Sequence, residues 1–161
     1  MKALSHLRLL DLTHILSGPY AGMLLADLGM DTIKVEPPQG EGTRALQATD
    51  PHTSLHGMGA YFLTSNRNKT SITLDLKHEK GLAIFYELVK VSDVVLTNFS
   101  AGVTDRLNIG YAQLSKINPR IITCSITGFG ETGPGRDRPA FDIVAQAMGG
   151  TMSLNGEADG P

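Results

Sequence analysis

Apolar and polar positions follow two different periods along this chain, and the segments with each period alternate. Short apolar runs bounded by polar residues predict strands at residues 9–12, 32–36, 71–76, 93–99 and 120–126. Segments with apolar residues on one helical face predict helices at residues 21–28, 82–91, 104–107, 111–117 and 140–148. Because strands that alternate with helices favour parallel pairing, we expect an α/β fold whose mostly parallel sheet carries helices on both faces.

The first strand–helix unit has the clearest local signals, and residues 9–20 read LLDLTHILSGPY. Ser17 and Gly18 fit an N-cap region, and Pro19 fits the first helical position. Gly29 is expected to end this helix in a left-handed conformation. A helix start just beyond a strand end offers free N–H groups to an anion, but these residues alone favour an ordinary strand–helix connection over a ligand site.

The next strand and the loop after it differ in pattern. Alternation in residues 32–36 puts Ile33 and Val35 on one face and Lys34 and Glu36 on the other. Residues 39–59 show little periodicity and contain four glycines, three threonines and two histidines, together with Asp50 and Pro51. A loop of this length within a compact domain is unusual unless it is functional or rests on a partner.

The composition and charge of the chain limit the kinds of partner that we expect and the cellular location. A length of 161 residues fits one domain, and 41% apolar and 19% charged residues are values of a globular chain. The net charge of −2 gives no electrostatic reason to expect a nucleic-acid partner. No apolar stretch is long enough to span a membrane, and the first residues lack a signal-peptide core, so we expect no membrane partner and a cytoplasmic location.

Single residues that could carry chemistry each have a simpler structural interpretation. Cys124 lies in the apolar run IITCSI and is predicted to be a packed strand residue rather than a nucleophile. His14, at a strand end, is as compatible with a capped or core histidine as with a ligand contact. The other histidines are too scattered to indicate a metal. Asp142 could be a base, although a carboxylate favoured by the helix dipole is the simpler account.

A glycine-rich loop follows the last predicted strand, and residues 128–133 match the pattern G-x-G-x-x-G. No helix begins at its third glycine, because Pro134 and Pro139 interrupt the segment, and no acidic residue follows at the expected distance. We therefore expect a flexible loop near a ligand and no NAD. Arg136 and Arg138 could contact phosphates, but a solvated charge cluster is favoured.

Four stretches in collinear order carry a stronger signal: LDLTHILSGPYAGMLLADLGMDTIKVEPP, YFLTSNRNKTSITLDLK, DVVLTNFSAGVTDRLNIGY and NPRIITCSITGFGETGPGRDRPAFDIVAQAMGG. Together they resemble the class III CoA-transferases, a group that includes formyl-CoA transferase, carnitine CoA-transferase and α-methylacyl-CoA racemase. The resemblance covers nearly the whole chain. It implies an incomplete, Rossmann-like large domain of a longer fold, in which two subunits interlock as a homodimer. It also implies CoA or acyl-CoA as a substrate, with no metal.

The resemblance further implies seven residues that contact CoA: His14, Ser17, Leu74, Lys77, Asn98, Phe99 and Arg106. The first two would approach the nucleotide or the pantetheine, the next two would line the adenine and phosphate region, and the last three would hold the pantetheine and a phosphate. Lys77 and Arg106 supply cations for phosphates, and Phe99 supplies an apolar surface. Pro37 departs from some relatives, which carry an arginine there.

In this family, an aspartate carboxylate attacks the acyl-CoA, and CoA moves to a carboxylic acid through an aspartyl-CoA thioester. That aspartate lies downstream of a segment matched here by LNGEADGP, residues 154–161. We therefore expect the nucleophile beyond Pro161, and residues 1–161 to be the N-terminal part of the CoA-binding large domain. No catalytic residue is assigned, and the chain alone is expected to be inactive.

Two other functions stay open beside CoA transfer. In the racemase branch a His-Asp pair opens the helix matched by residues 140–148, whereas this chain has Phe141 and Asp142. Proton abstraction next to a thioester needs such a base, so a transferase is favoured over a racemase. A non-catalytic CoA-binding module that works with a partner chain, or a nonfunctional fragment, is the remaining alternative.

Overall fold

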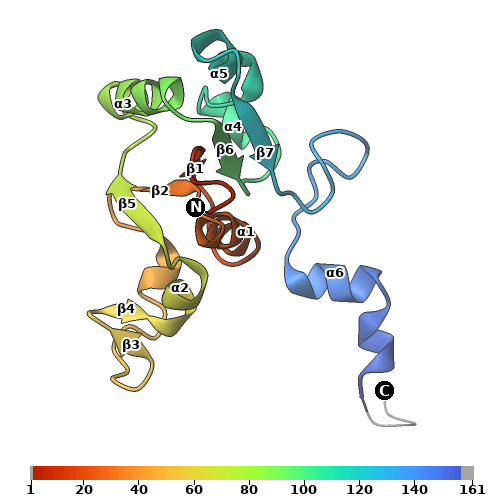
Figure 1. Cartoon of the computed structure of the whole chain (residues 1–161). Coiled ribbons are helices and arrows are strands. Elements are labelled where there is room, and N and C mark those ends of the chain that lie inside the picture. Colours follow the sequence, from red (N-terminus) through yellow and green to blue (C-terminus); the bar gives the residue numbers. More distant parts are fainter. Residues whose placement is uncertain (1, 157–161) are drawn as a thin grey trace.

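The computed structural model describes residues 2–156 and centres on a five-stranded sheet whose neighbouring strands are all parallel (Figure 1). The strand order is β5-β2-β1-β6-β7, and the register sets Leu10 of β1 opposite Ile33 of β2 and Val95 of β6. The strands are β1 (Arg8–Asp11), β2 (Asp31–Glu36), β5 (Lys69–Thr73), β6 (Val94–Thr97) and β7 (Ile122–Ser125). The predicted parallel α/β sheet is confirmed.

The helices and two minor strands connect and cover this sheet. The helices are α1 (Ser17–Asp27), α2 (Ala60–Ser65), α3 (Glu79–Lys90), α4 (Val103–Arg106), α5 (Tyr111–Ile117) and α6 (Asp142–Met148). Two 3-10 turns are η1 (Gly42–Arg44) and η2 (Thr151–Leu154), and a small antiparallel hairpin consists of β3 (Ser54–Leu55) and β4 (Met58–Gly59). The loop expected at residues 39–59 therefore contains structure, and η1 and β4 contact α2 within the chain.

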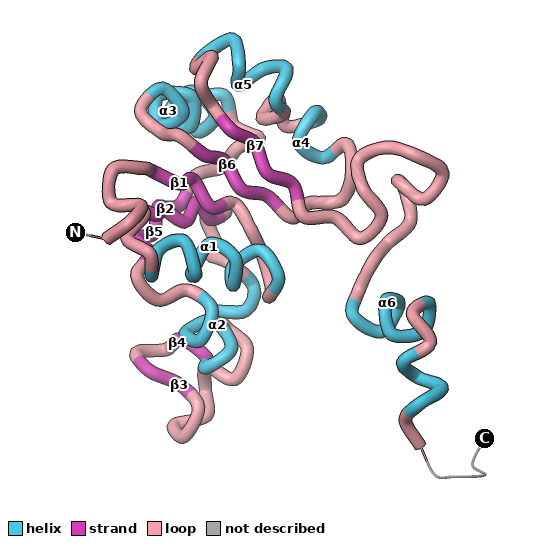
Figure 2. Tube along the Cα trace, turned by 45° about the vertical axis from the view of Figure 1, so that its right-hand side comes forward, coloured by secondary structure: helices cyan, strands magenta, loops and turns pink. Residues whose placement is uncertain are grey.

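Two apolar clusters lie on opposite faces of the sheet. The larger cluster joins Leu10 and Val95 to Phe85 of α3 and Leu114 of α5. The smaller cluster joins Leu9 and its neighbours on the other face to the α1 residues Ala21 and Leu25. Successive strand residues point to opposite faces, so one run such as residues 9–12 supplies both clusters. Helices on both faces, as predicted, follow from this alternation (Figure 2).

Some predicted boundaries differ from those observed. Gly29 has φ +102°, which confirms the left-handed residue expected after the first helix. Ser17 is not an N-cap: α1 begins at Ser17, after Leu16, and no side chain caps it. The strand expected at residues 71–76 is β5 at Lys69–Thr73, because its ladder with β2 begins at the pair Thr32 and Lys69.

The C-terminal part of the described chain is largely exposed. Cys124 was expected to be packed but is exposed, because β7 is the edge strand and three of its four residues are exposed. Helix α6 and η2 extend away from the sheet in both views, and none of their residues is buried (Figures 1 and 2). Residues 157–161, which include most of the LNGEADGP segment, lie outside the described residues. Within residues 2–156, no helix has both the length and the apolar character needed to cross a bilayer.

Candidate functional site

A cavity of about 210 Å³ opens at the carboxyl ends of the central strands. It is lined by four of the seven predicted residues, His14, Leu74, Lys77 and Phe99. His14 follows β1 and Phe99 follows β6, and the strand order reverses direction between these two strands. Ligands of open parallel sheets bind at such a switch point, beyond the carboxyl ends of the strands. The position of the cavity is therefore that of a ligand site.

The walls of this cavity are mostly apolar, but three charged residues also line it: Lys77 and Asp75 are exposed, and Glu36 is buried. Leu12, Val35 and Leu107 line it together with the predicted residues. The His14 ring rests on the Phe99 ring at a centroid distance of 5.2 Å and an angle of 47°. Burial, followed by the positive charge of Lys34, lowers the pKa of His14 below its usual value. The imidazole is therefore neutral at pH 7, which makes it an uncharged part of the wall.

The other three predicted residues lie outside this cavity. Ser17 and Asn98 line a neighbouring open cavity of about 670 Å³, which the residues around the start of α6 complete. Arg106 is exposed on α4 and lines none of the cavities described here. Its guanidinium and that of Arg136 both lie close to Gly102, where a built Cβ atom would sit 3.5 Å and 3.2 Å from their nitrogens. The seven residues thus spread along one edge of the sheet.

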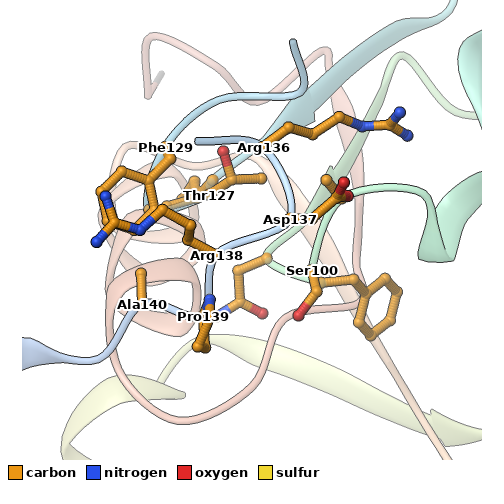
Figure 3. A pocket seen from close by; sticks show the side chains of 13 residues that line it. Ser100, Thr127, Phe129, Arg136, Asp137, Arg138, Pro139 and Ala140 are labelled. Atoms are coloured by element: carbon orange, nitrogen blue, oxygen red, sulfur yellow. The ribbon is translucent and has the colours of Figure 1, made fainter. Parts of the chain in front are cut away.

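A third pocket, of about 220 Å³, lies between the loop after β6 and the glycine-rich loop (Figure 3). Arg136, Asp137 and Arg138 contribute to it, and the Arg138 guanidinium lies 5.3 Å from the centre of the Phe129 ring. All three charged side chains are exposed, as a solvated cluster predicts. Within residues 2–156, neither arginine has a carboxylate within 4 Å. The cluster therefore brings positive charge to the pocket beside Phe99.

The N–H groups of the turn between β1 and α1 are bound by one side chain of β1 and by two side chains from distant loops. The N–H of Thr13 donates to Asp11 Oδ1 at 2.9 Å, the N–H of His14 to Asn98 Oδ1 at 2.8 Å, and the N–H of Ile15 to Glu41 Oε1 at 3.2 Å. These three groups are therefore not free to bind an anion. The observation supports the ordinary strand–helix connection that the residues alone favour.

Two buried lysines hold the carbonyl groups at the two ends of this turn. Lys34 Nζ donates to the carbonyl of Thr13 at 2.8 Å, and Lys69 Nζ donates to that of Pro19 at 2.7 Å. Lys69 also pairs with Asp11 at 2.7 Å, and both side chains are almost completely buried. Burial lowers the pKa of Lys69, although Asp11 opposes that effect. The sequence showed Lys34 only as the polar face of a strand and gave no signal for Lys69.

Glu36 and Arg44 anchor the loop that delivers Glu41 to the turn. Arg44 forms a forked pair with Glu36, with Nη2–Oε1 and Nε–Oε2 distances of 2.6 and 2.7 Å. Burial by itself would raise the pKa of Glu36, but hydrogen bonds from Arg44, Ser71 and the Glu41 N–H outweigh it and lower the pKa to about 2. The long loop predicted between residues 39 and 59 was the sequence signal for this part. Glu41 itself, which binds the Ile15 N–H, had no signal in the sequence.

No metal centre is visible in the part of the chain that the structure describes, since no group of three or more His, Cys, Asp or Glu side chains converges there. The cavity beside His14 and Phe99 is therefore a mostly apolar pocket whose lining includes one exposed cation, Lys77, and one exposed carboxylate, Asp75. Such a pocket suits an organic ligand that carries phosphate groups.

The sequence of this chain is similar to those of one protein family. The model of a family described as "CoA-transferase family III" matches residues 4–161. The chain is 48% identical over 156 residues to an acetyl-CoA:oxalate CoA-transferase of Acetobacter aceti, covering 96% of this chain and 39% of that protein. It is 44% identical over 161 residues to a succinyl-CoA:glutarate CoA-transferase of Mus musculus, covering 99% and 36%.

The structural comparison agrees with the sequence comparison. A crystal structure of a CAIB/BAIF family protein from Brucella suis superposes with a TM-score of 0.90 at 44% identity. The match covers 99% of this chain and 42% of that one. This chain thus spans about two fifths of the length of the relatives and structures that it matches.

Proposed function

This chain belongs to CoA-transferase family III, and on that basis we propose that it binds the nucleotide and pantetheine of a CoA thioester. The observation that carries the proposal is the cavity at the switch point of the sheet, where His14, Leu74, Lys77 and Phe99 meet. We also propose that residues 1–161 act as the N-terminal part of a CoA-binding large domain.

The chemistry of the cavity fits the two kinds of surface on CoA. The apolar walls, formed by side chains such as Leu12 and Leu74, suit the adenine ring or the pantetheine chain. Lys77 at the cavity and Arg106 on α4 are exposed, and neither has a carboxylate within 4 Å among residues 2–156. Cations without a protein partner can pair with the phosphate groups of CoA. His14, being neutral, would contact the ligand through its ring.

The reaction that we propose for the whole protein is CoA transfer between a thioester and a carboxylic acid. A protein carboxylate attacks the thioester carbonyl and expels the CoA thiolate, which leaves an acyl–aspartyl anhydride. The thiolate then attacks the aspartyl carbonyl, releases the first acid and forms the aspartyl-CoA thioester. Relatives named for oxalate, mesaconate and glutarate support this class of substrate. We assign the attacking aspartate to no residue of this chain.

The assembly that we propose is a homodimer of the longer protein. Support comes from large exposed apolar residues in this part of the chain: Phe141, directly before α6, is 65% exposed, and Leu154 of η2 is 88% exposed. Racemase activity is not part of the proposal. Phe141 stands where the racemase branch carries its histidine, and a phenyl ring cannot accept a proton.

Binding of CoA by the 161-residue chain tests the proposal. Thermal unfolding is followed with CoA, with NAD and without ligand, for the chain and for Lys77→Ala, with the exposed Lys116→Ala on α5 as a matched control. CoA at 100 times its dissociation constant is expected to add about 2.7 kcal/mol to the stability of the folded chain. Lys77→Ala should weaken this effect, and Lys116→Ala should not. A folded chain that CoA leaves unchanged, or that NAD alone stabilises, would contradict the proposal.

A further inference from the structure

Ile15 has an unfavourable backbone conformation at the entrance to α1. Its φ of +67° lies in the left-handed region, where a β-branched residue is a genuine outlier. Its side chain is 51% exposed, so packing does not hold it in place. Strained residues persist where their surroundings over-determine them, and they concentrate at binding and catalytic sites. The contacts that hold Ile15 are therefore informative about function.

The Asn98 side chain forms hydrogen bonds with both polar backbone groups of His14. Its Oδ1 accepts from the His14 N–H at 2.8 Å, and its Nδ2 donates to the His14 carbonyl at 2.7 Å. Glu41 adds a third bond, from the Ile15 N–H to Oε1 at 3.2 Å. The His14 carbonyl and the Ile15 N–H belong to one peptide group, so the two side chains fix both polar atoms of that group. These contacts bridge 84 and 26 residues of sequence.

The fixed peptide group controls where the His14 ring lies. The ring rests on Phe99, which follows Asn98 directly, and both rings line the cavity at the switch point. The loop after β1 and the loop after β6 are thus fastened to each other at two points, through the backbone of His14 and through its ring. If the turn relaxed to a favourable negative φ at Ile15, the ring would move relative to Phe99.

We infer that Asn98 and Glu41 are positioning residues for the cavity: they hold the His14–Ile15 peptide in its left-handed turn and so keep the His14 ring on Phe99. The inference rests on the proposed function only in assigning CoA to the cavity. It also changes the role expected of Asn98. The resemblance implied a contact with pantetheine, whereas the side-chain oxygen and one amide N–H group are already engaged by His14.

The experiment combines a variant that removes the hydrogen bonds between Asn98 and His14 with one that removes the backbone strain at Ile15. Asn98→Ala is expected to weaken CoA binding, measured by calorimetry on the 161-residue chain, on the order of tenfold. Adding Ile15→Gly should restore most of the affinity, because glycine adopts a positive φ without steric cost. Ile15→Ala is the matched control: it removes the same side chain beyond Cβ but keeps the Cβ that disfavours a positive φ, so it should restore much less affinity than glycine does.

A second measurement needs no ligand. The Phe99 ring shifts the proton resonances of His14, and NMR should show that shift lost in Asn98→Ala and regained in the Asn98→Ala, Ile15→Gly double variant. If the chain binds no CoA, the proposed function fails, while the NMR series still tests whether Asn98 holds the His14 ring on Phe99. If Asn98→Ala does not fold, Glu41→Ala and the conservative Glu41→Gln, which keeps an acceptor oxygen and should lose less, provide the same test. Equal recovery of CoA affinity with Ile15→Gly and Ile15→Ala would overturn the inference. Unchanged His14 resonances in the Asn98 and Glu41 variants would also overturn it.

Discussion

The Glu36 carboxylate should make the stability of this fold depend on acid in a measurable way. Its side chain is 1% exposed and its pKa is lowered from 4.5 to about 2, because Arg44, Ser71 and the Glu41 N–H outweigh the effect of burial. Since each tenfold change in proton affinity is worth about 1.4 kcal/mol, the ionised form contributes about 3 kcal/mol of stability. A lowered pKa in the folded state means that this contribution is complete above pH 4.5 and is lost as the pH falls toward 2.

The measurement is urea unfolding between pH 7 and pH 3 for the chain and for Glu36→Gln, which cannot ionise. The difference in unfolding free energy between the two proteins should shrink by about 2 kcal/mol by pH 3, because protonated Glu36 no longer gains from Arg44. Glu87→Gln is the matched control, since the Glu87 side chain is 70% exposed and, among residues 2–156, forms an ion pair only with Lys90 on the same helix. A difference for Glu36→Gln that stays constant across this range would refute the reasoning.

Three further substitutions or reactions test the packing around the turn and the sheet edge. Gly22→Ala should destabilise the fold by about 1–3 kcal/mol in thermal unfolding, since its Cβ would lie 2.6 Å from Asp11 Oδ2; an unchanged melting temperature would contradict this close approach. Lys69→Met should cost about 3–5 kcal/mol, because it leaves Asp11 buried without its partner, and adding Asp11→Leu should recover part of the loss in urea unfolding. The exposed Cys124 should react with a thiol reagent in the folded chain at close to the rate measured in the unfolded chain. A thiol that reacts only after unfolding would contradict the exposed position of Cys124 at the sheet edge.

The sequence predicted the elements better than it predicted their surroundings. Period-2 and period-3.6 patterns depend on neighbours in the chain, so the strand at β1 and the helix at α5 could be located from the residues alone. Cys124 looked buried because its run is apolar, but burial depends on what covers the strand, and β7 is at the edge of the sheet. Lys34 sat on the polar side of an alternating strand and yet is almost completely buried. Its face of the sheet is covered by other elements, which no local pattern reveals.

The candidate site divides in the same way. His14 and Phe99 could be named because each lies at the end of a predicted strand and because the family resemblance implied both. Asn98 was named as well, but its role as a clamp on His14 depends on two hydrogen bonds across 84 residues. Glu41 gave no signal, because a glutamate in an aperiodic loop has no periodic context. Contacts of this length are set by topology, and local sequence does not encode them.

The cations around the candidate site fall into two groups, one buried and engaged within the chain and the other exposed. Lys34 and Lys69 are buried and already engaged by the carbonyl groups of the turn, so they organise the backbone and offer nothing to a ligand. Lys77, Arg106 and Arg136 are exposed, and within residues 2–156 none has a carboxylate within 4 Å. Under the proposed function, we therefore expect phosphate contacts from the exposed side chains at the rim of the sheet and not from the N–H groups of Thr13, His14 and Ile15, which already donate to Asp11, Asn98 and Glu41.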